Sequence, residues 1–136
     1  ITTICINNTN FGMPGGQASA TTLVGQVTKT TPAGRNPEYA GYPIHAAEMV
    51  AKCDGAAFVA RASICSPASI KKTKEILRKA FEMQIKGIGY SFVEILAACP
   101  TNWGMNAVDS MKHIKDDIEK VHPVGIFKDI TLTEVR

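Results

Sequence analysis

The sequence of 136 residues lacks the features that mark several classes of protein. It contains no apolar run near the ~20 residues that a membrane helix needs. Its first residues show neither the basic leader nor the cleavage pattern of a signal peptide. Aromatic residues make up only 7% of the chain, and none interleaves with the basic run between Lys71 and Lys79. We therefore expect no membrane and no nucleic acid as partner, and we expect the basic run to be a solvated helix face.

Cysteines are few and carry no motif spacing. The four are Cys5, Cys53, Cys65 and Cys99, and no pair stands in a Cys-x-x-Cys arrangement. We expect no disulfide framework, because the chain is large enough to bury a core without one. Cys5, Cys53 and Cys65 have apolar or small neighbours, which indicates core packing.

Hydrophobic periodicity indicates alternating strands and helices. Strands are predicted at 1–8, 57–62 and 90–97, and helices at 43–52, 67–86 and 106–121. This alternation predicts an α/β fold with a parallel sheet and helices on both faces. The tail from Val124 is interpreted as an arm that reaches a neighbouring molecule.

Two loops follow predicted strands, at 9–42 and 98–106. Ligands of parallel sheets bind beyond the carboxyl ends of strands, and a loop as long as 9–42 is usually functional. The chain also opens without an initiator methionine, directly in the β-branched run Ile1–Ile6. We expect it to be a fragment of a longer polypeptide.

The segment Asn7–Gln17 has the chemistry of half a metal–diphosphate site. Asparagine amides and backbone carbonyls are neutral oxygen ligands that suit Mg²⁺. Gly12, Gly15 and Gly16 allow the backbone to approach a bulky anion closely. The segment lacks the carboxylate that such a site normally has, and a turn-rich loop without a ligand is the alternative reading of the residues alone.

This segment resembles the second half of the thiamine-diphosphate fingerprint. Further stretches resemble the thiamine-diphosphate-binding β subunit of 2-oxoacid:ferredoxin oxidoreductases, closest to the branched-chain (2-oxoisovalerate) group. The stretches that carry the resemblance are Asn10–Gln17, Thr21–Gly25, Thr31–Arg35, Gly41–Pro43, Phe92–Leu96 and Cys99–Met105.

The resemblance implies a partial thiamine-diphosphate-binding fold, in which residues 1–136 are the C-terminal part of a single domain. A Gly-Asp-Gly motif with the charged Mg²⁺ ligand, and a Cys-x-x-Cys pair, are then expected upstream. Asn8 is expected to give its side-chain oxygen and Asn10 its backbone carbonyl to Mg²⁺. Phe11, Gly12 and Met13 are expected to line the cofactor.

The resemblance further implies that Cys99 is the last ligand of a [4Fe–4S] cluster in the intact subunit. A small buried residue before a turn-forming proline is the alternative. No side chain is predicted to be catalytic. Because half of the metal site is absent, we expect the isolated chain to be inactive and to bind thiamine diphosphate weakly or not at all.

The implied activity is oxidative decarboxylation of a 2-oxoacid to acyl-CoA with reduction of ferredoxin, in a cytoplasmic hetero-oligomer whose other subunits complete the active site. The alternatives are a noncatalytic α/β ligand-binding or assembly module, and a decarboxylase or synthase of the wider thiamine family. The stretch Cys99–Trp103 argues against the last. Arg35 is expected to be a surface cation rather than a ligand of an anionic substrate or CoA, and Glu94 to face a loop.

Overall fold

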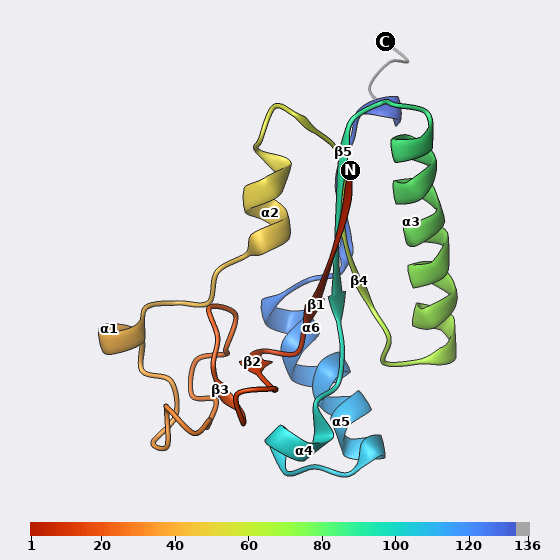
Figure 1. Ribbon diagram of the computed structural model, residues 1–136. Coiled ribbons are helices and arrows are strands. Elements are labelled where there is room, and N and C mark those ends of the chain that lie inside the picture. Colours follow the sequence, from red (N-terminus) through yellow and green to blue (C-terminus); the bar gives the residue numbers. More distant parts are fainter. Residues whose placement is uncertain (133–136) are drawn as a thin grey trace.

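Four strands form the sheet of the computed structural model, which describes residues 1–132 (Figure 1). Their order across the sheet is β1 (Thr2–Asn7), β5 (Tyr90–Leu96), β4 (Ala56–Ser63) and β6 (Gly125–Asp129). The first three are parallel, as expected. Their carboxyl ends point to one end of the molecule, where the hairpin of β2 and β3 and the short helix α4 lie (Figure 1).

β6 corrects the interpretation of the tail as an arm. Residues Gly125–Asp129 pair antiparallel with β4 of the same chain, so the sheet is mixed and not wholly parallel. Phe127 on β6 packs into the apolar cluster on the α2 face of the sheet, which explains why this segment folds back. The last four residues, 133–136, lie outside the described part of the chain.

Helices cover both faces of the sheet, which confirms that part of the predicted fold (Figure 1). α2 (Ala46–Ala51) lies on one face and α3 (Pro67–Ile85) on the other. The predicted C-terminal helix is continuous but changes its hydrogen-bond period. It comprises α5 (Ala107–His113), a π-helical turn (Ile114–Ile118) and α6 (Glu119–Val121). Shorter elements are β2 (Asn10–Phe11), β3 (Gln17–Ala18), α1 (Pro37–Ala40), α4 (Pro100–Trp103) and a 3₁₀ turn (Ile130–Leu132).

Alternation along the strands divides the core between the two faces. Phe58 and Val93 pack beneath α3 with Ala80 and Met83 of that helix. Val59 and Phe92 point the other way, toward α2. The two faces are therefore filled by neighbouring residues of the same strands.

β1 differs from the buried strand that its β-branched sequence predicts. It lies at the edge of the described sheet, and α3 covers it only near Thr2, whose hydroxyl donates to the Ala80 carbonyl at 3.3 Å. Cys5 packs beneath α2, whereas Ile4 and Ile6 are 41% and 60% exposed. The run Ile1–Ile6 correctly predicts a strand, but α3 does not cover the Ile4 and Ile6 side chains of β1.

The start of one helix also differs from the prediction. α2 begins at Ala46 and not at Pro43, because the Ile44 N–H donates to the Ala20 carbonyl and ties this segment to the long loop. On α3, Thr73 and Met83 are buried, whereas Ile70 and Phe81 are 39% and 44% exposed.

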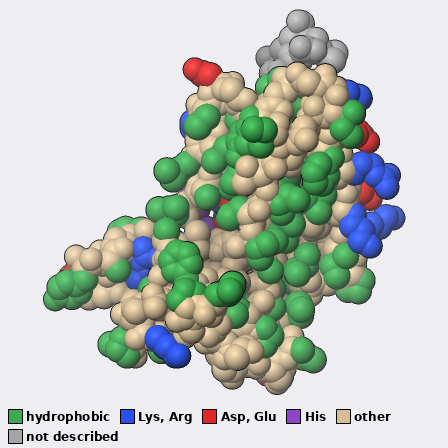
Figure 2. Space-filling view, viewed as in Figure 1, with side chains coloured by type: hydrophobic (Ala, Val, Ile, Leu, Met, Phe, Trp, Pro, Cys, Tyr) green, Lys and Arg blue, Asp and Glu red, His purple; other side chains and the backbone are tan. Residues whose placement is uncertain are grey.

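The basic run on α3 is a solvated face, as predicted. Lys71, Lys72, Lys74 and Arg78 are exposed, and Figure 2 shows lysine and arginine side chains gathered along one side of the molecule. Lys79 pairs with Asp129 on β6. Among the helices of residues 1–132, none combines the length and the apolar character needed to cross a bilayer.

Replacing Phe58 with alanine should lower the free energy of unfolding by about 3–5 kcal/mol, because the ring is fully buried and leaves a cavity. Urea unfolding of the variant and the parent measures the difference. Phe81→Ala on α3 is the matched control, since the Phe81 side chain is 44% exposed and should cost much less. Equal losses for the two variants would contradict the assignment of Phe58 to the core.

Candidate functional site

Two loops that are about ninety residues apart in sequence meet at the carboxyl ends of β1 and β5. We call residues 8–18, which include β2 and β3, the hairpin loop, and residues 99–104, which include α4, the 99–104 turn. The Trp103 indole N–H donates to the Asn8 carbonyl at 3.2 Å. The Asn102 amide donates to the Gly12 carbonyl at 3.3 Å and to the Cys99 sulfur at 3.1 Å. The structure therefore brings together the Asn8–Gly12 segment and Cys99, which sequence placed only by resemblance.

These loops lie close together at two glycines, and Gly16 is the one that its backbone conformation requires. Gly16 has a φ of +86°, and a Cβ built on it would lie 2.8 Å from the Asn102 side-chain oxygen. A Cβ on Gly12 would lie 3.3 Å from the Asn102 amide nitrogen and 3.5 Å from the Cys99 sulfur. The glycines thus let the hairpin backbone lie directly against the 99–104 turn.

The turn that follows β1 carries the two predicted metal ligands, Asn8 and Asn10. Between them lies Thr9, whose backbone has the left-handed conformation. Thr9 has a φ of +58° and is fully buried between Asn8 and Asn10. The Asn8 side-chain oxygen accepts from the Asn10 N–H at 3.4 Å, so it lies over the turn. The Asn10 side-chain oxygen is buried and has no hydrogen-bond partner. Such an atom is rare in a folded protein and fits a polar site that receives a further group.

The other predicted cofactor residues differ in their exposure. Phe11 is 54% exposed and Met13 is completely exposed, while Gly12 is partly covered by the 99–104 turn. No group of three or more His, Cys, Asp or Glu side chains within residues 1–132 is arranged to hold a metal ion. The turn Asn8–Asn10 itself can offer a cation only amide, hydroxyl and carbonyl oxygens.

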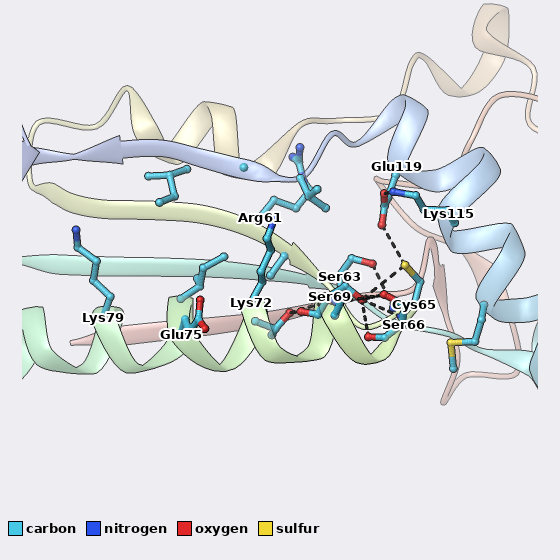
Figure 3. A pocket seen from close by; sticks show the side chains of 18 of the residues that line it. Arg61, Ser63, Cys65, Ser66, Ser69, Lys72, Glu75, Lys79, Lys115 and Glu119 are labelled. Carbon is cyan, nitrogen blue, oxygen red and sulfur yellow. Dashed lines mark hydrogen bonds and ion pairs between the residues drawn. The ribbon is translucent and has the colours of Figure 1, made fainter.

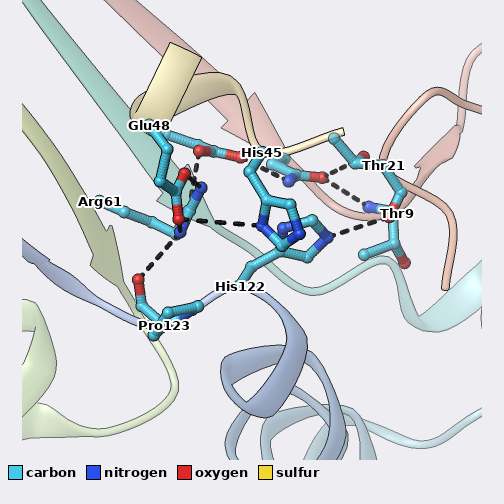
Figure 4. A network of polar contacts seen from close by, with 9 residues as sticks. Thr9, Thr21, His45, Glu48, Arg61, His122 and Pro123 are labelled. Carbon is cyan, nitrogen blue, oxygen red and sulfur yellow. Dashed lines mark hydrogen bonds and ion pairs between the residues drawn. The ribbon is translucent and has the colours of Figure 1, made fainter. Parts of the chain in front are cut away.

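A buried ion pair lies beside the site and was missed by the sequence reasoning. Arg61 on β4 and Glu94 on β5 are directly paired in register and both are fully buried. The Arg61 Nε donates to Glu94 at 2.8 Å, and its two terminal nitrogens donate to Glu48 of α2 at 2.9 and 2.5 Å (Figure 4). Arg61 also donates to the Pro123 carbonyl at 3.0 Å. The prediction that Glu94 faces a loop is therefore wrong.

Two groups around this pair have pKa values below their usual range. Burial lowers the pKa of His122, whose ring lies 5.2 Å from that of His45 and whose Nε2 donates to the Thr21 carbonyl at 3.2 Å. The Nδ1 of His122 is buried without a partner. For Glu48, burial acts to raise the pKa, but hydrogen bonds and charge from Arg61 outweigh it and the pKa is lowered.

Arg35 organises the long loop and is not the surface cation that sequence suggested. Its side chain is buried, and its guanidinium donates to six backbone carbonyls. The accepting residues are Ser19, Ala20, Thr22, Ala40, Gly41 and Tyr42. Arg35 therefore holds both halves of the 9–42 loop together. With every donor directed at the backbone, it has no group left for an anionic ligand.

The cysteines follow the prediction only in part. Cys5 and Cys65 are half-buried, but Cys53 is exposed in the turn after α2, so its assignment to the core is wrong. All four are free thiols. Burial raises the pKa of the Cys5 thiol, and the charge of Glu94 raises it further.

A large cavity lies apart from the loops described above. It has a volume of about 1070 Å³ and lies between α3, β4 and the C-terminal helix (Figure 3). At its rim the Cys65 thiol donates to Glu119 at 3.3 Å, and Lys115 pairs with the same carboxylate at 2.7 Å. None of the residues predicted from sequence to bind cofactor or metal lines it.

Comparison with known proteins gives a consistent result. Residues 1–95 match the family described as the C-terminal TPP binding domain of thiamine pyrophosphate enzymes. The chain is similar to ketoisovalerate oxidoreductase subunit VorA of Methanothermobacter marburgensis, with 44% identity over 124 residues that cover 91% of this chain and 26% of the relative. It is 33% identical over 144 residues to 2-oxoglutarate synthase subunit KorB of Archaeoglobus fulgidus, covering 98% of this chain and 49% of that one.

The chain also shares its fold with a solved structure. That structure is the 2-oxoglutarate:ferredoxin oxidoreductase from Magnetococcus marinus with 2-oxoglutarate, coenzyme A and succinyl-CoA bound, with a TM-score of 0.66 and 23% identity. The similarity covers 99% of this chain and 51% of that one. The chain thus spans between about a quarter and a half of the length of these curated relatives.

His122 should make the fold sensitive to mild acid. Its folded pKa lies below the usual 6.5, so the unfolded chain binds the proton more readily and stability falls as the pH drops below about 6.5. Glu48 adds a further loss at lower pH, below its ordinary value of 4.5. His122→Gln should flatten the dependence of the unfolding free energy on pH between about 6.5 and 5. Denaturant titrations over this range, with pH 8 as reference, measure it, and an unchanged slope would contradict the assignment.

Proposed function

The chain belongs to the family of C-terminal thiamine pyrophosphate-binding domains of thiamine pyrophosphate enzymes, and on that basis we propose that it forms the C-terminal part of the cofactor-binding domain of a 2-oxoacid:ferredoxin oxidoreductase. The observation that carries the proposal is the contact between the hairpin loop and the 99–104 turn. The similarity to ketoisovalerate oxidoreductase and 2-oxoglutarate synthase subunits supports this enzyme class over the wider thiamine decarboxylases and synthases.

The proposed reaction is oxidative decarboxylation of a 2-oxoacid to acyl-CoA with reduction of ferredoxin. When bound, thiamine diphosphate supplies the carbanion chemistry at the 2-oxo carbon, and the protein binds and orients it. We propose no catalytic side chain in this chain. The proposed partners are other subunits of the enzyme and ferredoxin. We propose a cytoplasmic hetero-oligomer in which residues outside this sequence supply the remaining half of the cofactor site.

Asn8 and Asn10 are the proposed Mg²⁺ ligands, through the side-chain oxygen of Asn8 and the backbone carbonyl of Asn10. Neutral oxygens are suited to this hard cation. The buried, unpartnered side-chain oxygen of Asn10 and the glycine-lined backbone of the hairpin loop support the fit of a metal–diphosphate group. We propose that Phe11, Gly12 and Met13 lie along the cofactor.

Cys99 is the proposed ligand of a [4Fe–4S] cluster in the intact protein, where it would support one-electron transfer. Its sulfur lies against Gly12, the residue proposed to line the cofactor, and accepts a hydrogen bond from Asn102. A cluster ligand in contact with the cofactor loop suits electron transfer between the two groups. Hydrogen bonds to ligating sulfurs also tune cluster potentials.

Removing the Asn8 amide in the full-length protein should weaken Mg²⁺-dependent binding of thiamine diphosphate by at least about tenfold, because a metal ligand is lost. Isothermal titration calorimetry with the cofactor, with and without Mg²⁺, measures the effect for Asn8→Ala. Asn36→Ala is the matched control, since Asn36 only caps α1 through the Glu38 N–H. Unchanged Mg²⁺-dependent binding by Asn8→Ala would contradict the assignment of Asn8 as a metal ligand.

Replacing Cys99 with alanine should remove or reshape the iron–sulfur signal of the full-length protein, since one of the cluster's ligands is lost. Electron paramagnetic resonance of the reduced protein, together with iron content, is the measurement. Cys53→Ala supplies the control, because Cys53 is exposed in the turn after α2. A native signal in Cys99→Ala would assign Cys99 to packing alone.

A further inference from the structure

A layer of buried polar side chains connects the interior of the sheet to the turn that carries Asn8 and Asn10. Glu94, on the central strand β5, is fully buried between β4 and β1. One of its oxygens accepts from the Arg61 Nε at 2.8 Å, and the other accepts from the Asn7 amide at 2.6 Å. Each oxygen of the carboxylate is therefore directed to a different neighbouring strand.

The chemistry of Glu94 determines which way the Asn7 side chain faces. A carboxylate paired with a guanidinium only accepts hydrogen bonds, so the NH₂ group of Asn7 must face it. The Asn7 side-chain oxygen then points to the loop. It accepts from the Thr9 N–H at 2.9 Å and from the Thr21 hydroxyl at 2.8 Å. Figure 4 shows Thr9, Thr21 and Arg61 within this one network.

The Thr9 conformation depends on these bonds. A positive φ is strained for a β-branched residue, and Thr9, at +58°, is the only non-glycine residue with one among residues 1–132. Besides Asn7, the Thr22 hydroxyl donates to the Thr9 carbonyl at 2.6 Å and the Gln26 amide to the Thr9 hydroxyl at 2.9 Å. Because Thr9 separates Asn8 from Asn10, its backbone sets the directions of both neighbours.

We propose that Glu94, held by Arg61, is a positioning residue for the metal-binding turn Asn8–Asn10 and acts through the Asn7 amide. The inference rests on the proposed magnesium site and adds to it a residue that touches neither metal nor cofactor. Orienting partners of this kind typically contribute about 10–100-fold to metal affinity. The buried pair then has a role in ligand geometry as well as in the packing of α2 against the sheet.

Exchanging the acid and the amide between positions 7 and 94 tests the proposal. In Glu94→Gln the new side-chain NH₂ group has to face either Arg61 or the NH₂ group of Asn7, and both of these are donors. If the Asn7 amide rotates to avoid this contact, its own NH₂ group faces the Thr9 N–H, which is also a donor. A donor faces a donor in every arrangement. Asn7→Asp alone sets two carboxylates side by side. In the double variant N7D/E94Q the carboxylate at position 7 accepts from Thr9, and the amide at 94 donates to it and accepts from Arg61.

The measurement is Mn²⁺ binding to the full-length protein in the presence of thiamine diphosphate, followed by electron paramagnetic resonance of the free ion. Each single variant should bind Mn²⁺ about 10–100-fold more weakly than the parent. The double variant should return to within about threefold of the parent, since the two substitutions are coupled. Single variants that bind like the parent, or a double variant that stays as weak as they are, would overturn the proposal.

Thr73→Val controls for general destabilisation. Thr73 is buried on α3, where its hydroxyl donates to the Ser63 and Ser69 carbonyls, away from the turn. Thr73→Val should lower the stability as much as the single variants do and leave the Mn²⁺ affinity unchanged. If it weakened Mn²⁺ binding as much as the single variants do, the proposal would be overturned. Absence of Mn²⁺ binding in the parent would overturn the proposed function together with this inference, whereas binding in the parent with unaffected variants overturns the inference alone.

Discussion

A guanidinium and a carboxylate without access to water lie at the centre of this fold, and the rest of the structure depends on keeping them paired. Removing two charges from water costs several kcal/mol per ion unless their remaining hydrogen-bonding atoms find partners. Arg61 and Glu94 find those partners on Glu48, Asn7 and the Pro123 carbonyl. The pair therefore ties together the strands β1, β4 and β5, the helix α2 and the end of the C-terminal helix.

The face of the sheet that α2 covers changes from apolar to polar along the strands. Beneath α2 it is apolar, with Val59 beside Phe92 in register. One step toward the carboxyl ends it becomes polar, with Arg61 beside Glu94. Packing thus gives way to hydrogen bonding just before the loops begin. In the long loop, hydrogen bonding has the same role, because the buried guanidinium of Arg35 donates to six backbone carbonyls.

Local sequence patterns predicted the principal strands and helices, but not how they combine. Arg61 and Glu94 each stand two residues before the last residue of a mainly apolar strand. Their matching positions in the two strands are a sequence signal. An ion pair can be inferred from it only when β4 and β5 are known to be parallel neighbours. β6 was missed because it is short and joins the sheet through β4, which is distant in sequence.

The candidate site was predictable in chemistry and not in geometry. Amide oxygens and glycines after a strand indicated a metal–diphosphate loop, and family resemblance named Asn8, Asn10 and Cys99. Spacing alone could not bring Cys99 against Gly12, since that contact depends on β1 and β5 being adjacent. It also could not identify Asn102, whose amide bridges the two loops.

The uncovered outer edge of β1 has a practical consequence for handling the chain on its own. Unpaired backbone groups beside exposed Ile4 and Ile6 form a template to which another strand can add. Two copies can use this edge against each other, so concentrated samples of the isolated polypeptide are expected to self-associate through it. A strand whose sequence, read alone, resembles an interior one thus lies at an exposed edge of the described sheet.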